Sequence, residues 1–154
     1  MADDSLKKIE VYIMKISTKG RYGLTIMIDL AKNEGNGPIS LKVIAKDNDL
    51  SEHYLEQLAS PLRNAGLIKS IRGAYGGYQL AKQPDEITAG DVIRVLEGPL
   101  TIVEGMENEK PAQASLWMQI RDAVKDVLEK TTLEDLANYD EGDNGPREAY
   151  MFYI

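Results

Sequence analysis

The chain of 154 residues contains no cysteine and one histidine, His53. The absence of cysteine excludes disulfides, thiolate nucleophiles, cysteine-based zinc sites and ordinary iron–sulfur ligation. A transition-metal site would need mostly carboxylate ligands, and a serine–histidine–aspartate site would need His53 itself, with no activated nucleophile nearby. We therefore expect no metal, no other cofactor, no catalytic residues and a protein that is not an enzyme.

Long hydrophobic runs are also missing. No apolar stretch approaches the roughly 18 residues that a membrane span needs. The first residues, MADDSLKKIEVYIM, are charged and lack the hydrophobic region of a signal peptide. The expected location is therefore the cytoplasm. The apolar content of 43% is ordinary for a globular protein, and the length suits one compact domain with an appended element.

Positive charge is scarce overall, since the formal net charge is −7, and this alone argues against DNA binding. The charge is unevenly distributed, however. Residues 14–82 carry ten Lys and Arg against six Asp and Glu, whereas residues 83–154 carry six against sixteen. A basic front and an acidic back can steer DNA to one side of a molecule, although an acidic surface can also simply maintain solubility.

The most informative stretch spans residues 39–80, where two short helical patterns precede two short strand patterns. Ser40 and Ser51 stand where the helices would begin, and a serine hydroxyl can accept a hydrogen bond from an N–H of the first turn. Between them, residues 47–49 (Asp-Asn-Asp) predict a polar turn, with Leu50 as the apolar residue beneath it. The predicted fold is mainly α with a small β-hairpin wing, a winged helix-turn-helix that binds DNA.

In the second of these helices, Tyr54, Leu55 and Leu58 recur at helical spacing and are expected to pack inward. Polar side chains are left outward near the helix start, where a helix-turn-helix meets base edges in the major groove. Glutamine can pair with adenine and a carboxylate can accept from cytosine, although a carboxylate without a base donor only repels phosphates. The predicted base-reading residues are Ser51, Glu52, His53, Glu56 and Gln57.

A glycine-rich tip follows this helix. Pro61 predicts a kink near the helix end, and Gly66 suits a left-handed exit. Residues 67–72 and 78–80 have strand character. Glycines between them let the backbone approach a narrow groove closely, although a nucleotide-phosphate loop and a plain hairpin are alternatives. The predicted minor-groove wing consists of Arg72, Gly73, Ala74, Tyr75, Gly76 and Gly77.

Ahead of this stretch, Ser17 or Thr18 can cap a helix that ends before residue 35. Lys19 and Arg21 fall in its first turn, where they and the helix N-terminus suit a DNA phosphate; the alternative is a solvated pair of charges. The predicted phosphate contacts are Lys19, Arg21, Tyr22, Tyr54, Arg63 and Lys69.

Beyond the wing, Thr88 and Asp91 predict a capping box that opens another helix. Residues 98–111 are loop-like, and their glutamates could bind a hard cation, although no regular ligand spacing is present. The longest helix is predicted over residues 112–130, with an apolar face wider than one small domain must cover. This favours dimerisation over purely intramolecular packing. The predicted dimerisation residues are Leu116, Trp117, Ile120, Ala123, Val124 and Val127.

Residues 140–147 are acidic and glycine-rich, and an aromatic, apolar peptide follows them. This pattern favours a peptide ligand that is captured by another protein, although the peptide could also fold back onto its own dimer. The predicted partner-binding tail is Met151, Phe152, Tyr153 and Ile154. The predicted organisation is an N-terminal extension (1–13), a DNA-binding domain (14–82), a helical dimerisation and regulatory region (83–139) and a flexible acidic tail (140–154).

Three segments carry a resemblance: STKGRYGLTIMIDLA (17–31), LSEHYLEQLASPLRNAGLIKSIRGAYGGYQL (50–80) and ITAGDVIRVLEGP (87–99). They resemble the IscR/CymR family of winged-helix transcription regulators. LWMQIRDAVKDVLEKTTLEDLA and YMFYI are most similar to its repressors of cysteine metabolism. The resemblance implies a homodimer built on the long helix and bound to a palindromic operator in double-stranded DNA. It also implies DNA contacts from the positions matching residues 19–22, 51–57 and 72–77.

The resemblance also bears on cofactors and partners. Iron–sulfur members place cysteines in the loop matching residues 98–114, where this chain has none, so neither a cluster nor thiol redox sensing is expected. The similar repressors act with cysteine synthase (O-acetylserine thiol-lyase), which accepts partner C-termini that end in isoleucine. This implies docking of residues 151–154 on that enzyme. The alternative function is an adaptor that mainly binds and restrains an enzyme through this tail.

Overall fold

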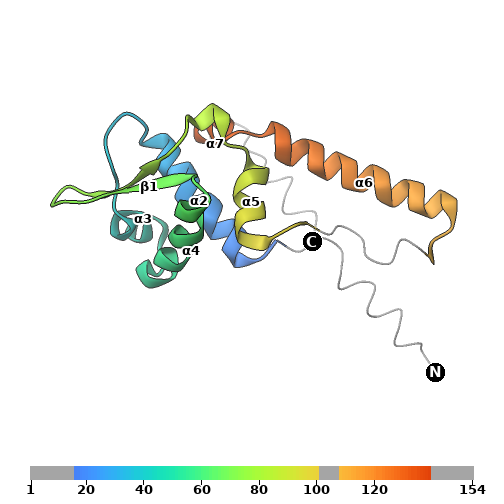
Figure 1. Cartoon of the computed structure of the whole chain (residues 1–154), viewed down its shortest axis with the longest axis horizontal. Coiled ribbons are helices and arrows are strands. Elements are labelled where there is room, and N and C mark those ends of the chain that lie inside the picture. The colour runs from blue at the N-terminus through green and yellow to red at the C-terminus, as the bar shows by residue number, and fades with distance from the viewer. Residues whose placement is uncertain (1–15, 101–107, 140–154) are drawn as a thin grey trace, which may run out of the picture.

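The computed structural model describes residues 16–100 and 108–139 (Figure 1). The mainly helical architecture with one small hairpin confirms the predicted fold. None of the described helices is long and apolar enough to cross a membrane. The elements in chain order are α2 (Thr18–Lys32), α3 (Leu41–Asn48), α4 (Glu52–Asn64), β1 (Ile68–Ile71), β2 (Gly77–Leu80), the 3-10 turn η1 (Pro84–Glu86), α5 (Ala89–Glu97), α6 (Pro111–Lys130) and α7 (Leu133–Ala137).

Hydroxyl side chains start most of these helices. In each case the hydroxyl oxygen accepts a hydrogen bond from a backbone N–H of the first turn, which satisfies a donor that the helix itself cannot pair. Thr88 and Thr132 form complete capping boxes with Asp91 and Asp135. The capping residues are Ser17, Ser40, Ser51, Thr88 and Thr132. The caps proposed from the sequence are therefore confirmed.

The core surrounds α2, whose side chains Ile26, Met27 and Leu30 are buried. The chain that follows the long helix α6 returns to this core. Leu133 is fully buried, and its backbone N–H donates to the carbonyl of Ile87 over 2.9 Å. Figure 1 shows α7 beside α2 and η1, whereas α6 projects away from the rest of the molecule. Regions 14–82 and 83–139 thus contribute side chains to one core.

The turn between α3 and α4 is shorter than predicted. Helix α3 continues through Asp47 and Asn48, and only Asp49 adopts a left-handed conformation, with φ 53°. The amide of Asn48 donates to the carbonyl of Ile44 over 2.9 Å and to the carboxylate of Asp29 over 2.7 Å. These bonds hold Asn48 in the helix, so the prediction of a turn over residues 47–49 was wrong for its first two residues.

Helix α4 continues through Pro61 to Asn64, and Gly66 follows with φ 78°, the expected left-handed exit. The two strands form an antiparallel hairpin in which Ile68 pairs with Leu80 and Ile71 with Gly77. Both strands lie within one or two residues of their predicted bounds. The α3, turn, α4 and hairpin order is that of a winged helix-turn-helix.

Candidate nucleic-acid interface

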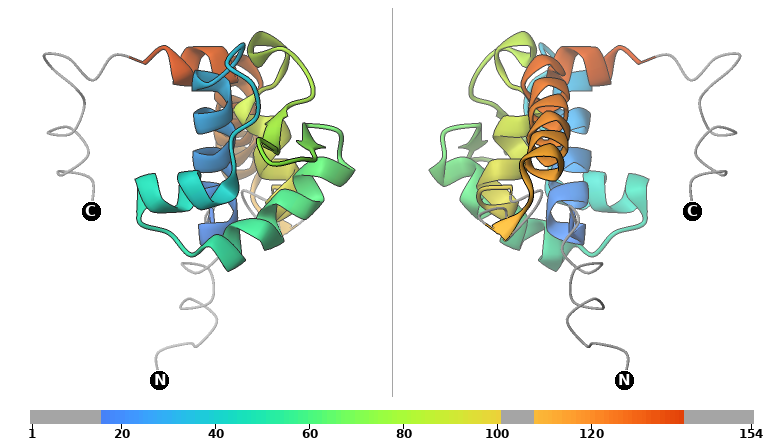
Figure 2. Two further views of the ribbon diagram at one scale, coloured as in Figure 1. Left: turned by 90° about the vertical axis from the view of Figure 1, so that its left-hand side faces the viewer. Right: turned by 90° about the vertical axis from the view of Figure 1, so that its right-hand side faces the viewer.

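The outer face of α4 carries the predicted base-reading side chains. Its inner face is buried through Leu55, Leu58 and Leu62, which anchors the helix and leaves the opposite face in solvent. The exposed residues of the outer face are Ser51, Glu52, His53, Glu56 and Gln57. Figure 2 shows α3, α4 and the N-terminal end of α2 together at the lower edge of the molecule. An exposed polar helix face at a molecular edge can enter the major groove of DNA.

Two of these side chains lie one turn apart and touch. The side-chain amide nitrogen of Gln57 is 3.3 Å from Nε2 of His53, within hydrogen-bonding distance. Within residues 16–100 and 108–139, no other side chain is hydrogen-bonded to the His53 ring. Among these described residues the ring thus has neither a nucleophile to activate nor a carboxylate to orient it, as a catalytic triad would require.

A pair of tyrosines joins the recognition helix to α2. The ring of Tyr54 packs edge-to-face against Tyr22, with centroids 5.8 Å apart and an interplanar angle of 86°. The Tyr54 hydroxyl lies 3.4 Å from the hydroxyl of Thr18. Edge-to-face aromatic pairs are favourable because the positive ring edge meets the negative face. The start of α2 and the first turn of α4 are therefore held together.

The cations predicted to lie at the interface are all exposed. The described ion pairs involve other cations, namely Arg94, Arg121 and Lys130. The predicted interface cations therefore form no ion pair within residues 16–100 and 108–139. These exposed cations are Lys19, Arg21, Arg63, Lys69 and Arg72. Their positive charges are available for phosphates.

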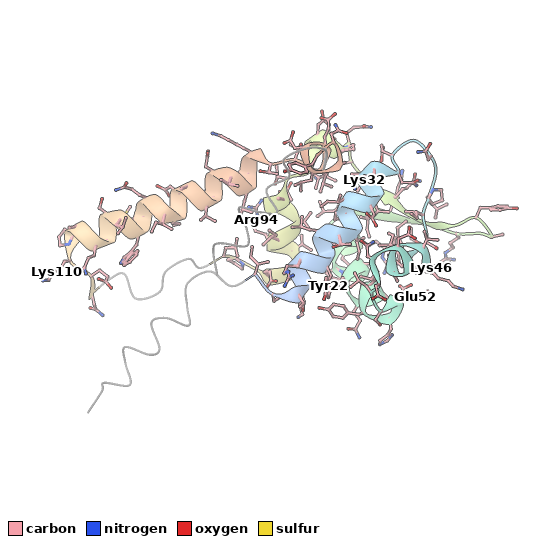
Figure 3. The ribbon with its side chains drawn as sticks, turned by 180° about the vertical axis from the view of Figure 1, so that it is seen from behind. Tyr22, Lys32, Lys46, Glu52, Arg94 and Lys110 are labelled. Atoms are coloured by element: carbon pink, nitrogen blue, oxygen red, sulfur yellow. The ribbon has the colours of Figure 1, made fainter. Side chains whose placement is uncertain are left out.

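Two further exposed cations, both on α3, were not predicted from the sequence. Lys42 and Lys46 are exposed on α3, the helix that crosses the DNA backbone in helix-turn-helix proteins. Their spacing of four residues, which places both on one helix face, was the available signal. In Figure 3, Lys46, Glu52 and Tyr22 lie on the same lower side of the molecule, while Arg94 lies on α5 near α6.

The N-terminus of α2 is occupied by a carboxylate from the end of α5. Oε1 of Glu97 accepts from the backbone N–H groups of Ser17 (2.9 Å) and Gly20 (3.0 Å) and from the Ser17 hydroxyl. Desolvation raises the pKa of Glu97. The hydrogen bonds from Ser17 and Gly20, with the charge of Lys19, outweigh it and hold the pKa below its ordinary value. The expectation that this helix N-terminus binds a phosphate is therefore wrong for these two N–H groups.

The wing is a short hairpin with a bent tip. The N–H of Gly76 donates to the carbonyl of Gly73 over 3.0 Å, and Tyr75 at the tip is 94% exposed. At the wing base, Tyr78 and Ile39 exchange two backbone hydrogen bonds of 2.8 and 2.9 Å. These bonds fix the hairpin to the chain that enters α3. Figure 1 shows the wing extending beyond the core on the side away from α6.

Helix α6 has no buried residue. Its apolar face has two parts. Val124 and Leu128 are half-buried and line, with Leu100 and Arg94, a cavity of about 190 Å³ between α5 and α6. The other part remains in solvent: the exposed fractions are 48% for Leu116, 39% for Ile120 and 63% for Val127. Ala123 is also exposed, and Trp117 is half-buried.

Two predicted features fall where the structure gives no description. The tail, Met151 to Ile154, lies outside the described residues, as do Glu104 and Glu107 of the glutamate-rich loop. The partner-binding tail and the cation site therefore stay predictions from the sequence.

Comparison with known proteins gives consistent matches. A family model described as "Rrf2: Iron-dependent Transcriptional regulator" matches residues 16–139. The HTH-type transcriptional regulator CymR of Bacillus subtilis (strain 168) is 72% identical over 141 residues, covering 92% of this chain and 100% of its own. IscR of Pectobacterium atrosepticum is 37% identical over 131 residues, covering 81% of this chain and 80% of its own.

Solved structures agree with these sequence matches. The structure of B. subtilis CymR (YrzC), described as its global cysteine regulator, superposes with a TM-score of 0.80 at 71% identity and covers 84% of this chain and 100% of its own. Staphylococcus aureus CymR gives a TM-score of 0.72 at 64% identity, with 81% and 99% covered.

The iron dependence in the family description does not fit the residues of this chain. There is no cysteine anywhere in the sequence, and the only histidine is exposed on α4. The described parts of the chain hold no group of three or more His, Asp or Glu placed to bind a metal. These residues do not suit an iron–sulfur cluster, whose ligands are mainly thiolates.

Proposed function

Because the chain belongs to the Rrf2 family of winged-helix transcriptional regulators, we propose that it is a dimeric, sequence-specific DNA-binding repressor of genes for cysteine and sulfur metabolism. The observation that carries this proposal is the exposed polar face of α4, flanked by cations with no ion pair among the described residues. The relatives named above are regulators and not enzymes, which agrees with the expectation from the sequence.

Each part of the interface has its own role in this proposal. Helix α4 enters the major groove, where Gln57 pairs with adenine and Glu56 accepts from cytosine; Ser51, Glu52 and His53 complete the base-reading set. The wing, residues 72–77, lies along the minor groove, with Arg72 attracted by its negative potential. The phosphates are held by Lys19, Arg21, Tyr22, Tyr54, Arg63 and Lys69.

Dimerisation uses the exposed part of the α6 face. An apolar stripe of this size on a projecting helix is best covered by the same stripe of a second copy, because a two-fold axis makes one patch self-complementary. Two recognition helices in such a dimer meet half-sites about one DNA turn apart. The exposed part supplies Leu116, Ile120, Ala123 and Val127 to the proposed contact set, and the half-buried Trp117 and Val124 complete it.

The metabolic assignment is supported by similarity alone. The B. subtilis relative, described as a global cysteine regulator, is covered over its whole length at 71% identity. Identity at this level favours recognition of a similar DNA operator by the two proteins. We extend the proposal to cysteine synthase as the protein partner, docked through Met151 to Ile154. Deleting residues 151–154 should abolish synthase binding in a pull-down with purified enzyme, and unchanged binding would exclude this docking mode.

Selection from a random duplex DNA pool with the purified full chain tests the proposed function. The expected result is a palindrome that remains enriched at higher salt, because base contacts survive when counterions weaken phosphate contacts. The genes beside matching genomic sites then identify the pathway. Enrichment of no sequence would overturn the proposal and leave the tail-dependent adaptor as the better account.

A further inference from the structure

Glu97 connects the end of α5 to the start of α2, and sequence patterns gave no sign of it. We propose that Glu97 is a positioning residue for DNA binding, which holds the first turn of α2 so that its cations and Tyr54 meet the phosphate backbone together. This inference rests on the proposed function and adds a residue that does not itself touch DNA.

The contacts of the carboxylate are specific. One oxygen accepts three hydrogen bonds, from the N–H of Ser17, the N–H of Gly20 and the Ser17 hydroxyl. The Ser17 hydroxyl in turn accepts from the N–H of Lys19 over 3.2 Å. Hydrogen bonds to an ionised acceptor are about twice as strong as neutral ones. The turn that carries Lys19 and Arg21 is therefore anchored from outside its own helix.

The close approach of the two helices depends on two glycines. A Cβ at Gly20 would lie 2.9 Å from Oε1 of Glu97, and a Cβ at Gly23 would lie 1.9 Å from Cδ1 of Leu96. Both distances are too short for ordinary contacts, so the last turn of α5 lies directly against the first turns of α2. This packing holds the Glu97 carboxylate within hydrogen-bonding distance of the backbone N–H groups of Ser17 and Gly20.

The anchored turn is also tied to the recognition helix. Thr18 approaches the Tyr54 hydroxyl, and Tyr22 packs on the Tyr54 ring. A shift of the first turn of α2 would therefore move Lys19 and Arg21 relative to α4. Gly98, with φ 77°, follows Glu97 immediately and begins the segment that leads to α6. The contact of Glu97 with α2 thus lies between the proposed DNA-binding residues and the segment that leads to α6, the proposed dimerisation helix.

Electrostatic repulsion alone and a positioning role predict opposite effects of removing Glu97 on DNA affinity. Glu97 is negative and close to residues proposed to bind phosphates, so its removal would strengthen DNA binding if electrostatics were its only role. A positioning role predicts weaker binding after Glu97→Ala. It also predicts recovery with Glu97→Gln, because the amide oxygen still accepts from the same donors. The two accounts therefore differ in the sign of the effect.

A double-mutant cycle tests the proposal. The full chain and its Glu97→Ala variant are titrated with the palindromic duplex enriched from the random pool, in the wild-type background and in a Lys19→Ala/Arg21→Ala background. We expect about tenfold weaker binding in the first background and less than about twofold in the second, since residues in one network are not additive. If Glu97→Ala only destabilised the fold, the loss of DNA affinity would be the same in both backgrounds.

The control is Asp135→Ala, which removes the capping carboxylate of α7, near the other end of α2 (Figure 2). It should lower the melting temperature without changing affinity at a temperature where the protein is folded. If Glu97→Ala does not fold, Ser17→Ala, which removes only the hydroxyl partner, takes its place in the cycle. Additive losses, tighter binding, or a Glu97→Gln variant as weak as Glu97→Ala would overturn the inference. Failure of the wild-type chain to enrich any sequence would overturn the proposed function instead.

Discussion

At the scale of single residues, Gln57 is the residue proposed to read DNA sequence most directly. It is exposed on α4, and among the described side chains it hydrogen-bonds only to His53. Gln57→Ala should weaken binding to the enriched palindrome by about 1–3 kcal/mol, the usual cost of losing a bidentate base contact. Binding to a scrambled duplex should not change. Fluorescence anisotropy titrations measure both, with Ser60→Ala, exposed near the other end of α4, as the control. Equal losses on both duplexes would mean that Gln57 does not read bases.

Lys69 belongs to the same scale but acts differently, since it is exposed on β1 and is proposed to meet a phosphate. Lys69→Ala should lower affinity similarly for all sequences. It should also reduce the slope of log affinity against log salt by about 0.9 for the lost contact. Lys130, which pairs with Asp126 on α6, provides the control, because Lys130→Ala should leave the slope unchanged. An unchanged slope for Lys69→Ala would remove Lys69 from the interface.

Residue-scale prediction from sequence succeeded where the signal is local. Ser40 and Ser51 were found because a capping hydroxyl acts on an N–H two or three residues away. Glu97 was not found, because its partners Ser17 and Gly20 lie 80 and 77 residues away in the chain. Only the packing of α5 on α2 brings them together. No spacing rule within one element can show such a contact.

At the scale of elements, the wing depends on one close approach at its base. A Cβ on Gly77 would lie 2.5 Å from the carbonyl carbon and oxygen of Ile39, next to the two bonds that Ile39 makes with Tyr78. Gly77→Ala should therefore destabilise the fold by about 1–3 kcal/mol, as overpacking does, and displace the wing. Urea unfolding and DNA titration measure the two effects. Wild-type stability together with wild-type affinity would contradict this account of the wing.

The junction of α5 and α2 should depend on pH. The pKa of Glu97 is lowered in the folded chain, so its stabilising contribution is present above the ordinary carboxyl pKa and is lost as the pH falls through the folded value. The melting temperature of the wild type should exceed that of Glu97→Gln at pH 7. This difference should shrink as the pH falls through and below the ordinary carboxyl range. A constant difference across that range would show that the charged form is not the one stabilised.

Element boundaries show where local patterns are insufficient. Asp47 and Asn48 have the composition of a turn, but they remain helical because Asn48 bonds to Ile44 within α3 and to Asp29 on α2. The tertiary partner Asp29 overrides the local preference. By contrast, Gly66 ends α4 as predicted, because the need for a left-handed conformation is itself local.

At the scale of the whole molecule, the account requires two chains. Ile120→Asp would place a charge in the exposed apolar stripe of α6 and should convert the dimer to monomers, because an unpaired charge at a buried interface is costly. Sedimentation velocity measures the change, and affinity for the palindrome should fall with it. Ser115→Asp introduces the same charge on α6 outside the stripe and should remain dimeric. A dimeric Ile120→Asp variant would exclude this face as the interface.

The whole-molecule features that the sequence revealed were the fold and the uneven charge. The helix and strand order of residues 39–80 was sufficient for the winged-helix prediction, because capping serines, glycines and apolar spacing mark where these elements start and end. The dimerisation surface was harder to predict from the sequence. The apolar face of α6 was visible as a stripe, but its division into a part against α5 (Val124, Leu128) and an exposed part (Leu116, Ile120, Val127) required the packing of α5.

The most direct test of the central claim is one titration. The full chain is titrated into the enriched palindrome and into a scrambled duplex of equal length, each at two salt concentrations, with the stoichiometry measured at saturation. The account predicts two chains per palindrome and a preference over the scrambled duplex of at least about a thousandfold. This preference should persist when added salt weakens both affinities. Equal affinities that fall together with salt would show that the basic edge binds DNA only through its charge, and would contradict the account.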